Sequence, residues 1–435
     1  MTVSLLLFLG AAVLIRVALL HHDSCSFLQR RIEFSTPANS FRRLLEGIDL
    51  YQSGISPYSG GTFHEQPTIL VLFSYMQTGY SSLVPYLFVC FDLITAWLLG
   101  KAAENYILKQ AVRQKRLGYW RDQPMAKQLK PLLVQAKDSY SISLLVVCCY
   151  LFNPYSIGAC VAMTSSAWQN ALLAATCWAM LSERKTVALV FLSLAAFHAL
   201  YPFLLVVPVA LWYANHEVGR AAWWRSFLKS SLTFFAMWLG ITYAVASMWG
   251  SWDFIQATYG FLVSVPDLTP NVGLFWYFFT EMFDHFRLFF LWVFQLNLVV
   301  YLAPLALCLR DDPFVLYFEF LMLISVFKSY PSVADAALYL ALLPSWRHLF
   351  RFVRHGFLIC CTLLCTTVLG PVMWYLWIYV GSANANFFFA ITLLYATAQI
   401  FLLTDMLYAH LRVQIHMKHG LKPMVDEQEA KVMLD

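Results

Sequence analysis

Uninterrupted apolar runs recur along the whole chain, and they limit its possible folds more than any other feature. Two examples are LLVVCCYLF at 144–152 and FLLVVPVALW at 203–212. Such runs indicate helices, because the strands of a transmembrane β-barrel alternate apolar and polar residues. Only 12% of the 435 residues are charged and 60% are hydrophobic, whereas about 25% are charged in an average soluble domain. We therefore expect an all-α, polytopic membrane helical bundle rather than a water-soluble protein.

The apolar runs predict about twelve membrane spans within one membrane-embedded domain, 1–435. The predicted spans lie near 2–20, 82–100, 140–157, 164–182, 185–200, 202–214, 228–248, 285–309, 313–328, 333–349, 356–380 and 387–411. Residues 68–79 are too short to cross a bilayer, so we expect a re-entrant or interfacial helix there. Arg16 interrupts the first run, which we interpret as a retained span rather than a cleaved signal peptide. Tyr201-Pro202 predicts a break between two spans.

The distribution of basic residues predicts which loops face the cytosol and which face the lumen. Residues 101–139 hold nine Lys or Arg against three acidic residues, so the positive-inside rule makes this segment a cytosolic loop. Since the chain changes sides with each of the twelve predicted spans, the tail 412–435 is also expected in the cytosol. The loops 21–67, 249–273 and 381–386 are then expected on the luminal side. Within loop 21–67, we expect an amphipathic helix from Phe41 to Tyr51.

A group of four cations lies at the predicted cytosolic edge. They are Arg220, Arg225, Lys229 and Arg310. Their positive charge fits contact with anionic phospholipid, or simply topology determination. The basic segment 101–139 has few aromatic residues and lies between spans, so we do not expect nucleic-acid binding.

Two polar groups in the second half are candidate binding residues. Asn384 and Asn386 lie in the predicted luminal turn between the last two spans, where a spacing of two would place both amides on one side of an extended segment. Amides can hydrogen-bond hydroxyl or phosphate oxygens, but Asn is equally common in turns and helix caps. Glu281, Asp284 and His285 lie in an aromatic stretch and are expected to form a polar network or part of a lipid-cavity wall. A single His among them is a weak metal signal, and we expect neither metal nor cofactor.

Loop 21–67 carries a resemblance to a known enzyme class. The pattern LLEGIDLYQSGISPYSGGTFHEQPTILVLF at 44–73 resembles the first luminal loop of lipid-dependent mannosyltransferases of the endoplasmic reticulum, which have the multi-span GT-C fold. In those enzymes, an acidic pair in this loop supplies a general base. The matching stretch here, 31–37, holds only Glu33. The resemblance implies a retained scaffold without its base, and an active mannosyltransferase remains the alternative.

Longer blocks are similar to a more specific family. Residues 251–290, 327–342 and 374–389 resemble the phosphatidylinositol-glycan class U (PIG-U) family, whose members are subunits of GPI transamidase. The resemblance implies a non-catalytic subunit in the endoplasmic reticulum membrane that binds the GPI lipid and presents it for attachment to proproteins. It implies four partners: the protease subunit PIG-K, PIG-T, PIG-S and the GPI-anchor attachment subunit. With this resemblance, Asn384 and Asn386 are expected to contact the GPI headgroup.

Overall fold

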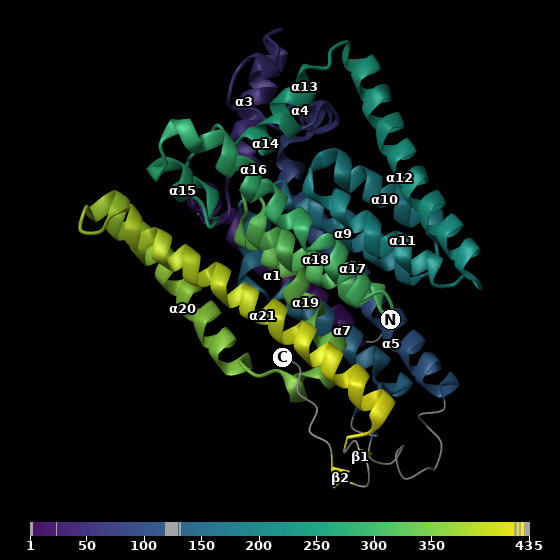
Figure 1. Cartoon of the computed structure of the whole chain (residues 1–435). Coiled ribbons are helices and arrows are strands. Elements are labelled where there is room, and N and C mark those ends of the chain that lie inside the picture. The colour runs from purple at the N-terminus through teal and green to yellow at the C-terminus, as the bar shows by residue number, and fades with distance from the viewer. Residues whose placement is uncertain are drawn as a thin grey trace.

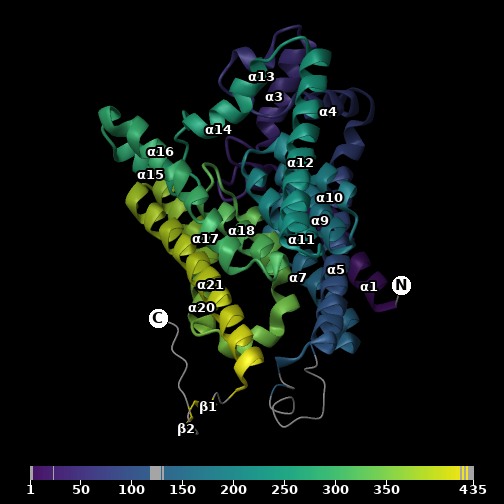
Figure 2. The same cartoon turned by 45° about the vertical axis from the view of Figure 1, so that its right-hand side comes forward.

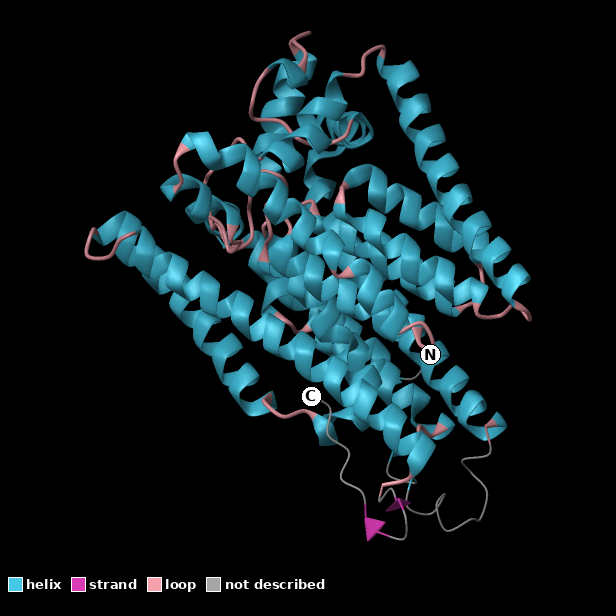
Figure 3. Cartoon of the chain, in the orientation of Figure 1, coloured by secondary structure: helices cyan, strands magenta, loops and turns pink. Residues whose placement is uncertain are grey.

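The computed structural model describes residues 3–22, 24–117, 129, 132–421, 424–425 and 428–429, and this part of the chain is almost entirely helical (Figure 3). The longer helices are α1 (Val3–His21), α3 (Phe41–Gln52), α4 (Pro67–Tyr80), α5 (Val84–Arg116), α7 (Ser139–Leu151), α8 (Pro154–Val161), α9 (Ser166–Leu181), α10 (Lys185–His198), α11 (Val206–Ala214), α12 (Arg220–Trp249), α15 (Phe275–Glu281), α16 (Asp284–Val300), α17 (Leu302–Cys308), α18 (Pro313–Phe327), α19 (Val333–Leu342), α20 (Gly356–Tyr375) and α21 (Ala385–His419). The predicted all-α fold is confirmed.

Short elements connect these helices. They are α2 (Ser24–Gln29), α13 (Asp253–Ile255) and α14 (Phe261–Ser264); the 3-10 turns η1 (Pro57–Ser59), η2 (Ser81–Leu83), η4 (Ala136–Asp138), η5 (Tyr201–Leu205) and η7 (Leu343–Phe352); and the π-helical turns η6 (Gln256–Gly260) and η8 (Leu376–Val380). Near the C-terminus, the two-residue strands β1 (Met424–Val425) and β2 (Gln428–Glu429) pair antiparallel.

The core of the bundle is built around α5. This helix packs against α7 and α9, and α9 packs against α10, while α18 and α19 lie beside them (Figure 1). Large side chains such as Tyr150, Tyr317, Tyr339 and Trp346 are fully buried there. α12 covers α10 and α11, and the α20–α21 hairpin lies along another side of the bundle, where α21 packs against α18 (Figure 2).

The bundle has two ends formed by different segments, and which end faces the lumen remains a prediction. The segments expected to be luminal, including α3, α13 and α14, gather at one end, and the last turns of α5 and α21 lie at the other (Figures 1 and 2). The helix expected at 41–51 is α3, and its apolar face buries Phe41, Leu44 and Ile48. These side chains join Phe63, Phe73 and others in a second hydrophobic core.

Several expected boundaries differ from the structure. α4 is not an isolated short helix, because η2 joins it to α5 in one helical run, Pro67–Arg116. The predicted basic loop 101–139 is helical up to Arg116, since residues 101–116 contain neither glycine nor proline and α5 continues through them. Residues 118–128 and 130–131 of that loop lie outside the described residues. α21 likewise continues past 412 to His419 and ends before Gly420, which has φ 85°.

The number of spans remains a prediction. Among the described residues, five helical runs are long and apolar enough to cross a membrane, and a sixth is obtained if the bent pair α7–α8 counts as one. Four shorter apolar helices, of 10–17 residues, add to these: Leu5–His21, Lys185–His198, Tyr201–Ala214 and Pro313–Phe327. The predicted break at Tyr201-Pro202 is confirmed, because α10 ends at His198 and η5 begins at Tyr201.

A buried ion pair attaches α1 to the rest of the bundle. Arg16 on α1 is fully buried, and its guanidinium lies 2.5 Å from the carboxylate of Asp92 on α5. Tyr150 donates a hydrogen bond to the second carboxylate oxygen of Asp92, and Arg16 also donates to the carbonyl of Leu151 and the hydroxyl of Ser156. The charge that interrupts the first apolar run is therefore fully paired, which is what a buried charge in a membrane protein requires.

Candidate functional site

A largely apolar cavity lies between the α20–α21 hairpin and the first loop, and we name it the hairpin cavity. Its volume is about 170 Å³. Its walls come from residues 27–34, from α8 and from both helices of the hairpin; the apolar lining includes Phe27, Leu28, Phe34, Phe388, Ile391 and Tyr395. A largely apolar cavity of this size can take an apolar ligand.

Most polar groups around the hairpin cavity are already paired; the buried hydroxyl of Tyr395 is an exception and has no hydrogen-bond partner among the described residues. The Arg31 guanidinium donates to both oxygens of Glu33, at 2.6 and 3.1 Å. The hydroxyl oxygens of Tyr155 and Thr367 lie 2.6 Å apart, and Thr367 also donates to the carbonyl of Leu363. The cavity therefore offers an apolar interior with one ion pair in its wall. Glu33, the lone carboxylate of the first loop, is engaged by Arg31.

A glycine on α20 leaves room for the cavity. Gly370 is buried and lines the cavity, yet a Cβ added there would meet no atom within 4 Å. The next residue, Pro371, also lines the cavity and lies inside the helix, where its ring removes one backbone donor. These two residues keep the α20 side of the cavity open.

The turn with the two asparagines lies next to this cavity. Asn384 is the N-cap of α21, and its side-chain oxygen accepts hydrogen bonds from the backbone N–H groups of Asn386 and Phe387. The expected extended segment is wrong, because α21 already begins at Ala385. The side-chain oxygen of Asn386 instead accepts a 2.6 Å hydrogen bond from the hydroxyl of Tyr277 on α15. Both asparagines are exposed, and Phe388, two residues further on, lines the hairpin cavity.

Glu281, Asp284 and His285 lie on two successive helices. Glu281 ends α15 and Asp284 begins α16, with extended backbone at Met282 between them. Glu281 and His285 are therefore not neighbours on one helix. All three side chains are exposed, and none lines the hairpin cavity. Among the described residues, no group of three His, Cys, Asp or Glu side chains is close enough to hold a metal ion.

The four predicted phospholipid-contacting cations are exposed at two connected turns. Arg220, Arg225 and Lys229 lie in the first turns of α12, and Arg310 lies between α17 and α18. Asn215, before α12, connects the two turns: its amide donates to the carbonyl of Arg310 at 2.6 Å and accepts from the indole N–H of Trp223. Contact with anionic lipid remains a prediction.

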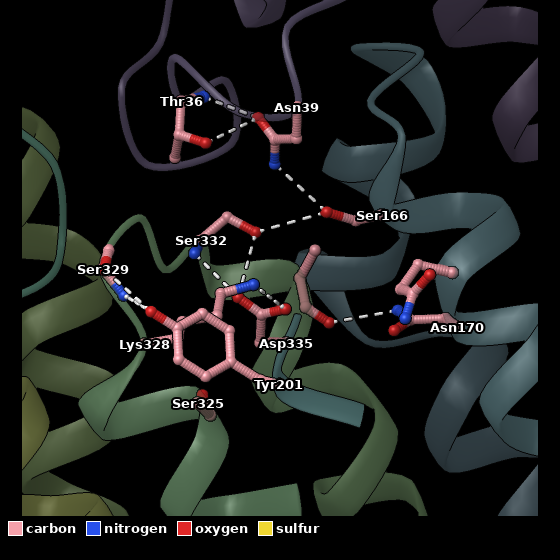
Figure 4. A network of polar contacts seen from close by, with 12 residues as sticks. Thr36, Asn39, Ser166, Asn170, Tyr201, Ser325, Lys328, Ser329, Ser332 and Asp335 are labelled. Carbon is pink, nitrogen blue, oxygen red and sulfur yellow. Dashed lines mark hydrogen bonds and ion pairs between the residues drawn. The ribbon is translucent and has the colours of Figure 1, made fainter. Parts of the chain in front are cut away.

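A polar network lies at the predicted luminal end (Figure 4). Asn39 connects the loop backbone at Thr36 with Ser166 at the start of α9. Ser332 and Asp335 form a capping box on α19, and Lys328 donates to Asp335 at 2.6 Å. The sequence Ser332-x-x-Asp335 before an apolar run is a capping-box pattern and could have been recognised. The link to Asn39 could not, because it joins residues more than a hundred positions apart.

The fold and the cavity define a polytopic helical membrane protein with an apolar site at the predicted luminal end of a helical hairpin. Comparison with known proteins agrees with this class of protein and identifies a specific family within it. A family model described as GPI transamidase subunit PIG-U matches residues 10–395. The GPI-anchor transamidase component PIGU of Homo sapiens is 40% identical over 426 residues, which cover 97% of each chain. The GPI transamidase component GAB1 of Saccharomyces cerevisiae is 29% identical over 390 residues, covering 89% of each.

The chain belongs to the PIG-U family of GPI transamidase subunits. It is thus a membrane component of the GPI transamidase complex, and its partners include other subunits of that complex.

Proposed function

We propose that this chain is the non-catalytic subunit that binds the GPI lipid in the endoplasmic reticulum membrane and presents it for attachment to the C-terminus of proproteins. The observation that supports this most is the hairpin cavity, which is apolar and lies beside the exposed turn of Asn384 and Asn386. A membrane lipid needs this combination: an apolar space for part of an acyl chain, and polar groups next to it for the headgroup. The proposed partners are PIG-K, PIG-T, PIG-S and the GPI-anchor attachment subunit.

The cysteine of the first loop supports a non-catalytic role. A cysteine nucleophile needs a lowered pKa, since the thiolate is the reactive form. Burial instead raises the pKa of the Cys25 thiol. This supports our proposal that a partner subunit carries out the transfer chemistry and that this chain positions the lipid.

Filling the hairpin cavity tests lipid binding. We expect Gly370→Leu to fold, because a Cβ at this position meets no neighbouring atom. A lipid chain would then enter a filled space, and overpacking of this kind costs about 1–3 kcal/mol, roughly a fivefold to hundredfold loss of affinity. The measurements are the GPI lipid retained by the purified complex, by mass spectrometry, and the rate of GPI attachment.

Gly240→Leu is the matched control. Gly240 lies in α12, is exposed, and likewise has no atom within 4 Å of an added Cβ. It should retain lipid and activity at the unaltered level. Equal lipid retention by the two variants, with normal assembly of both complexes, would refute the assignment of the cavity to lipid binding.

Glu33→Gln separates the proposed role from mannosyltransferase activity. The glutamine can still accept from Arg31, so we expect assembly and GPI attachment to remain close to normal, with a loss of about 1–2 kcal/mol in the free energy of unfolding as a charge-assisted bond becomes a neutral one. The readout is the amount of GPI-anchored protein at the cell surface. A large loss of attachment by a normally assembled complex would mean that Glu33 takes part in chemistry.

A further inference from the structure

A second cavity, which we name the polar cavity, lies at the predicted luminal end, where several distant segments meet. Its volume is about 80 Å³. It is lined by residues 38–39 and 64–65 of the first loop, by the start of α9, by the end of α10, by residues 258–262 and by the Lys328–Asp335 segment. The network of Figure 4 forms part of its wall, through Asn39, Ser166 and the Lys328–Asp335 ion pair.

Three buried polar atoms from residues that line the polar cavity lack a hydrogen-bond partner among the described residues. They are Nε2 of His64, Oε1 of Gln169 and Nδ1 of His198. Buried polar atoms are almost always paired, because leaving one unpaired costs the free energy of its lost hydration. Three such atoms around one small cavity therefore indicate that the cavity holds a polar occupant.

The chemistry of these atoms defines the occupant. Nδ1 of His64 lies 2.8 Å from the carbonyl oxygen of Ala257, which can only accept, so Nδ1 carries the proton. In the neutral ring with its proton on Nδ1, Nε2 is an acceptor, and burial, which lowers the pKa of His64, favours this neutral form. The amide nitrogen of Gln169 donates to the carbonyl of Ala195, which leaves its oxygen as a second acceptor. The occupant must therefore bring hydrogen-bond donors.

The charged groups of the polar cavity disfavour an anion. The ammonium of Lys328 is paired with Asp335 at 2.6 Å, and the second carboxylate oxygen of Asp335 accepts from the backbone N–H of Ser332. Glu65 contributes a carboxyl group whose pKa burial raises to about 7. A phosphate dianion, which is only an acceptor, would face the acceptor atoms of His64 and Gln169, and the ammonium of Lys328 is already paired. A neutral group with hydroxyl donors fits.

Aromatic rings add a flat apolar wall. The rings of His64 and Phe261 stack with centroids 3.4 Å apart, and Phe261 stacks on Tyr330 at 4.8 Å. A ring that bears hydroxyl groups also has apolar C–H faces, which such a wall can contact. The volume corresponds to about two or three water molecules at roughly 30 Å³ each, so it accommodates one edge of a hydroxylated ring rather than the whole ring.

We propose that the polar cavity binds the hydroxyl-bearing edge of a neutral polyhydroxylated ring, as found in sugars and inositol, with His64 and Gln169 accepting hydrogen bonds from its hydroxyl groups. The site is separate from the hairpin cavity, which holds the proposed acyl-chain site. Its ligand is either the glycan of a glycolipid or a free polyol.

The test uses the purified complex with mannose and myo-inositol as probes, detected by saturation-transfer difference NMR. We expect a signal from at least one probe. Losing one neutral hydrogen bond should weaken binding by about twofold to tenfold in each of two variants, Gln169→Leu and His64→Phe. The second variant keeps a ring to stack on Phe261. Gln52→Leu, on the exposed end of α3 and outside the polar cavity, should bind the probes as the unaltered complex does.

Three outcomes would overturn the proposal. The first is no signal from either probe, in which case water alone occupies the cavity. The second is an equal signal from the unaltered complex and both cavity variants. The third is that neither mannose nor myo-inositol binds, whereas inorganic phosphate does. Phosphate binding would be measured by ³¹P NMR and would be lost in both cavity variants.

A second readout identifies the source of the ligand and keeps this proposal distinct from lipid binding in the hairpin cavity. If the ligand is a lipid-borne glycan, Gln169→Leu and His64→Phe also slow GPI attachment; if it is a free polyol, they lose the NMR signal while attachment continues. Gly370→Leu should leave the NMR signal intact in either case. Loss of the signal in Gly370→Leu as well would contradict two independent sites.

Discussion

Replacing Asp92 by alanine is expected to lower the free energy of unfolding of the chain by about 3–5 kcal/mol, because it leaves the buried charge of Arg16 without its counter-ion. Arg16 is fully buried, and Asp92 is its only carboxylate partner among the described residues. The remaining acceptors, the carbonyls of Ala12 and Leu151 and the hydroxyl of Ser156, carry no full charge. Thermal unfolding of the detergent-solubilised chain, followed by size-exclusion chromatography with fluorescence detection, measures the loss.

Two controls distinguish charge pairing from a general effect of alanine. Glu104→Ala breaks the exposed Lys101–Glu104 pair on the same helix and should change stability by about 0–1 kcal/mol. The double variant Arg16→Leu, Asp92→Leu removes both charges. Its free energy of unfolding should therefore be close to that of the unaltered chain, unlike that of Asp92→Ala. An Asp92→Ala chain as stable as Glu104→Ala would show that the buried pair does not hold α1 to α5.

The Arg16–Asp92 pair is an example of a contact that could not be predicted from the sequence. Arg16 could be recognised as a charge inside an apolar run, and Asp92 lies inside another predicted span. Their contact joins residues 76 positions apart and depends on how α1 packs against α5, α7 and α8. Local features were predictable instead: the amphipathic pattern of α3 and the break before Pro202 depend on neighbouring residues only.

The same limit applies to the candidate site. The turn between the last two long helices was predicted at 381–386 and lies at 381–384, because both flanking apolar runs are long. Capping was one of the roles considered for Asn384. The hairpin cavity was not foreseen. Its walls come from residues 27–34, 154–155 and 366–395, and only the packed fold brings these together. The π-helical turn η8 before Gly381 was also not predictable from apolar periodicity.

The double variant Asn384→Ala, Asn386→Ala is expected to weaken binding of the GPI lipid by about 1–4 kcal/mol, roughly fivefold to several hundredfold, if both amides hydrogen-bond the headgroup. Both side chains are exposed, so the apolar packing of α20 and α21 is unaffected and the complex should assemble. We expect unprocessed proprotein to accumulate while GPI-anchored protein at the cell surface falls. The assay is flow cytometry of a GPI-anchored reporter at low expression of the variant.

Structural roles of the two asparagines must be separated from headgroup contact. Asn384 caps α21, and losing an N-cap costs about 0.5–2 kcal/mol of stability. Asn384→Ser preserves a capping oxygen but removes the amide donors, so it should lower GPI attachment without lowering stability. Tyr277→Phe removes the hydrogen bond to Asn386 from the other side and leaves both amides in place, so attachment should stay close to normal. Two results would contradict headgroup contact: full GPI attachment by Asn384→Ser, or a loss of attachment in Tyr277→Phe as large as in the double variant. In either case the asparagines only stabilise the turn, and the GPI headgroup binds elsewhere.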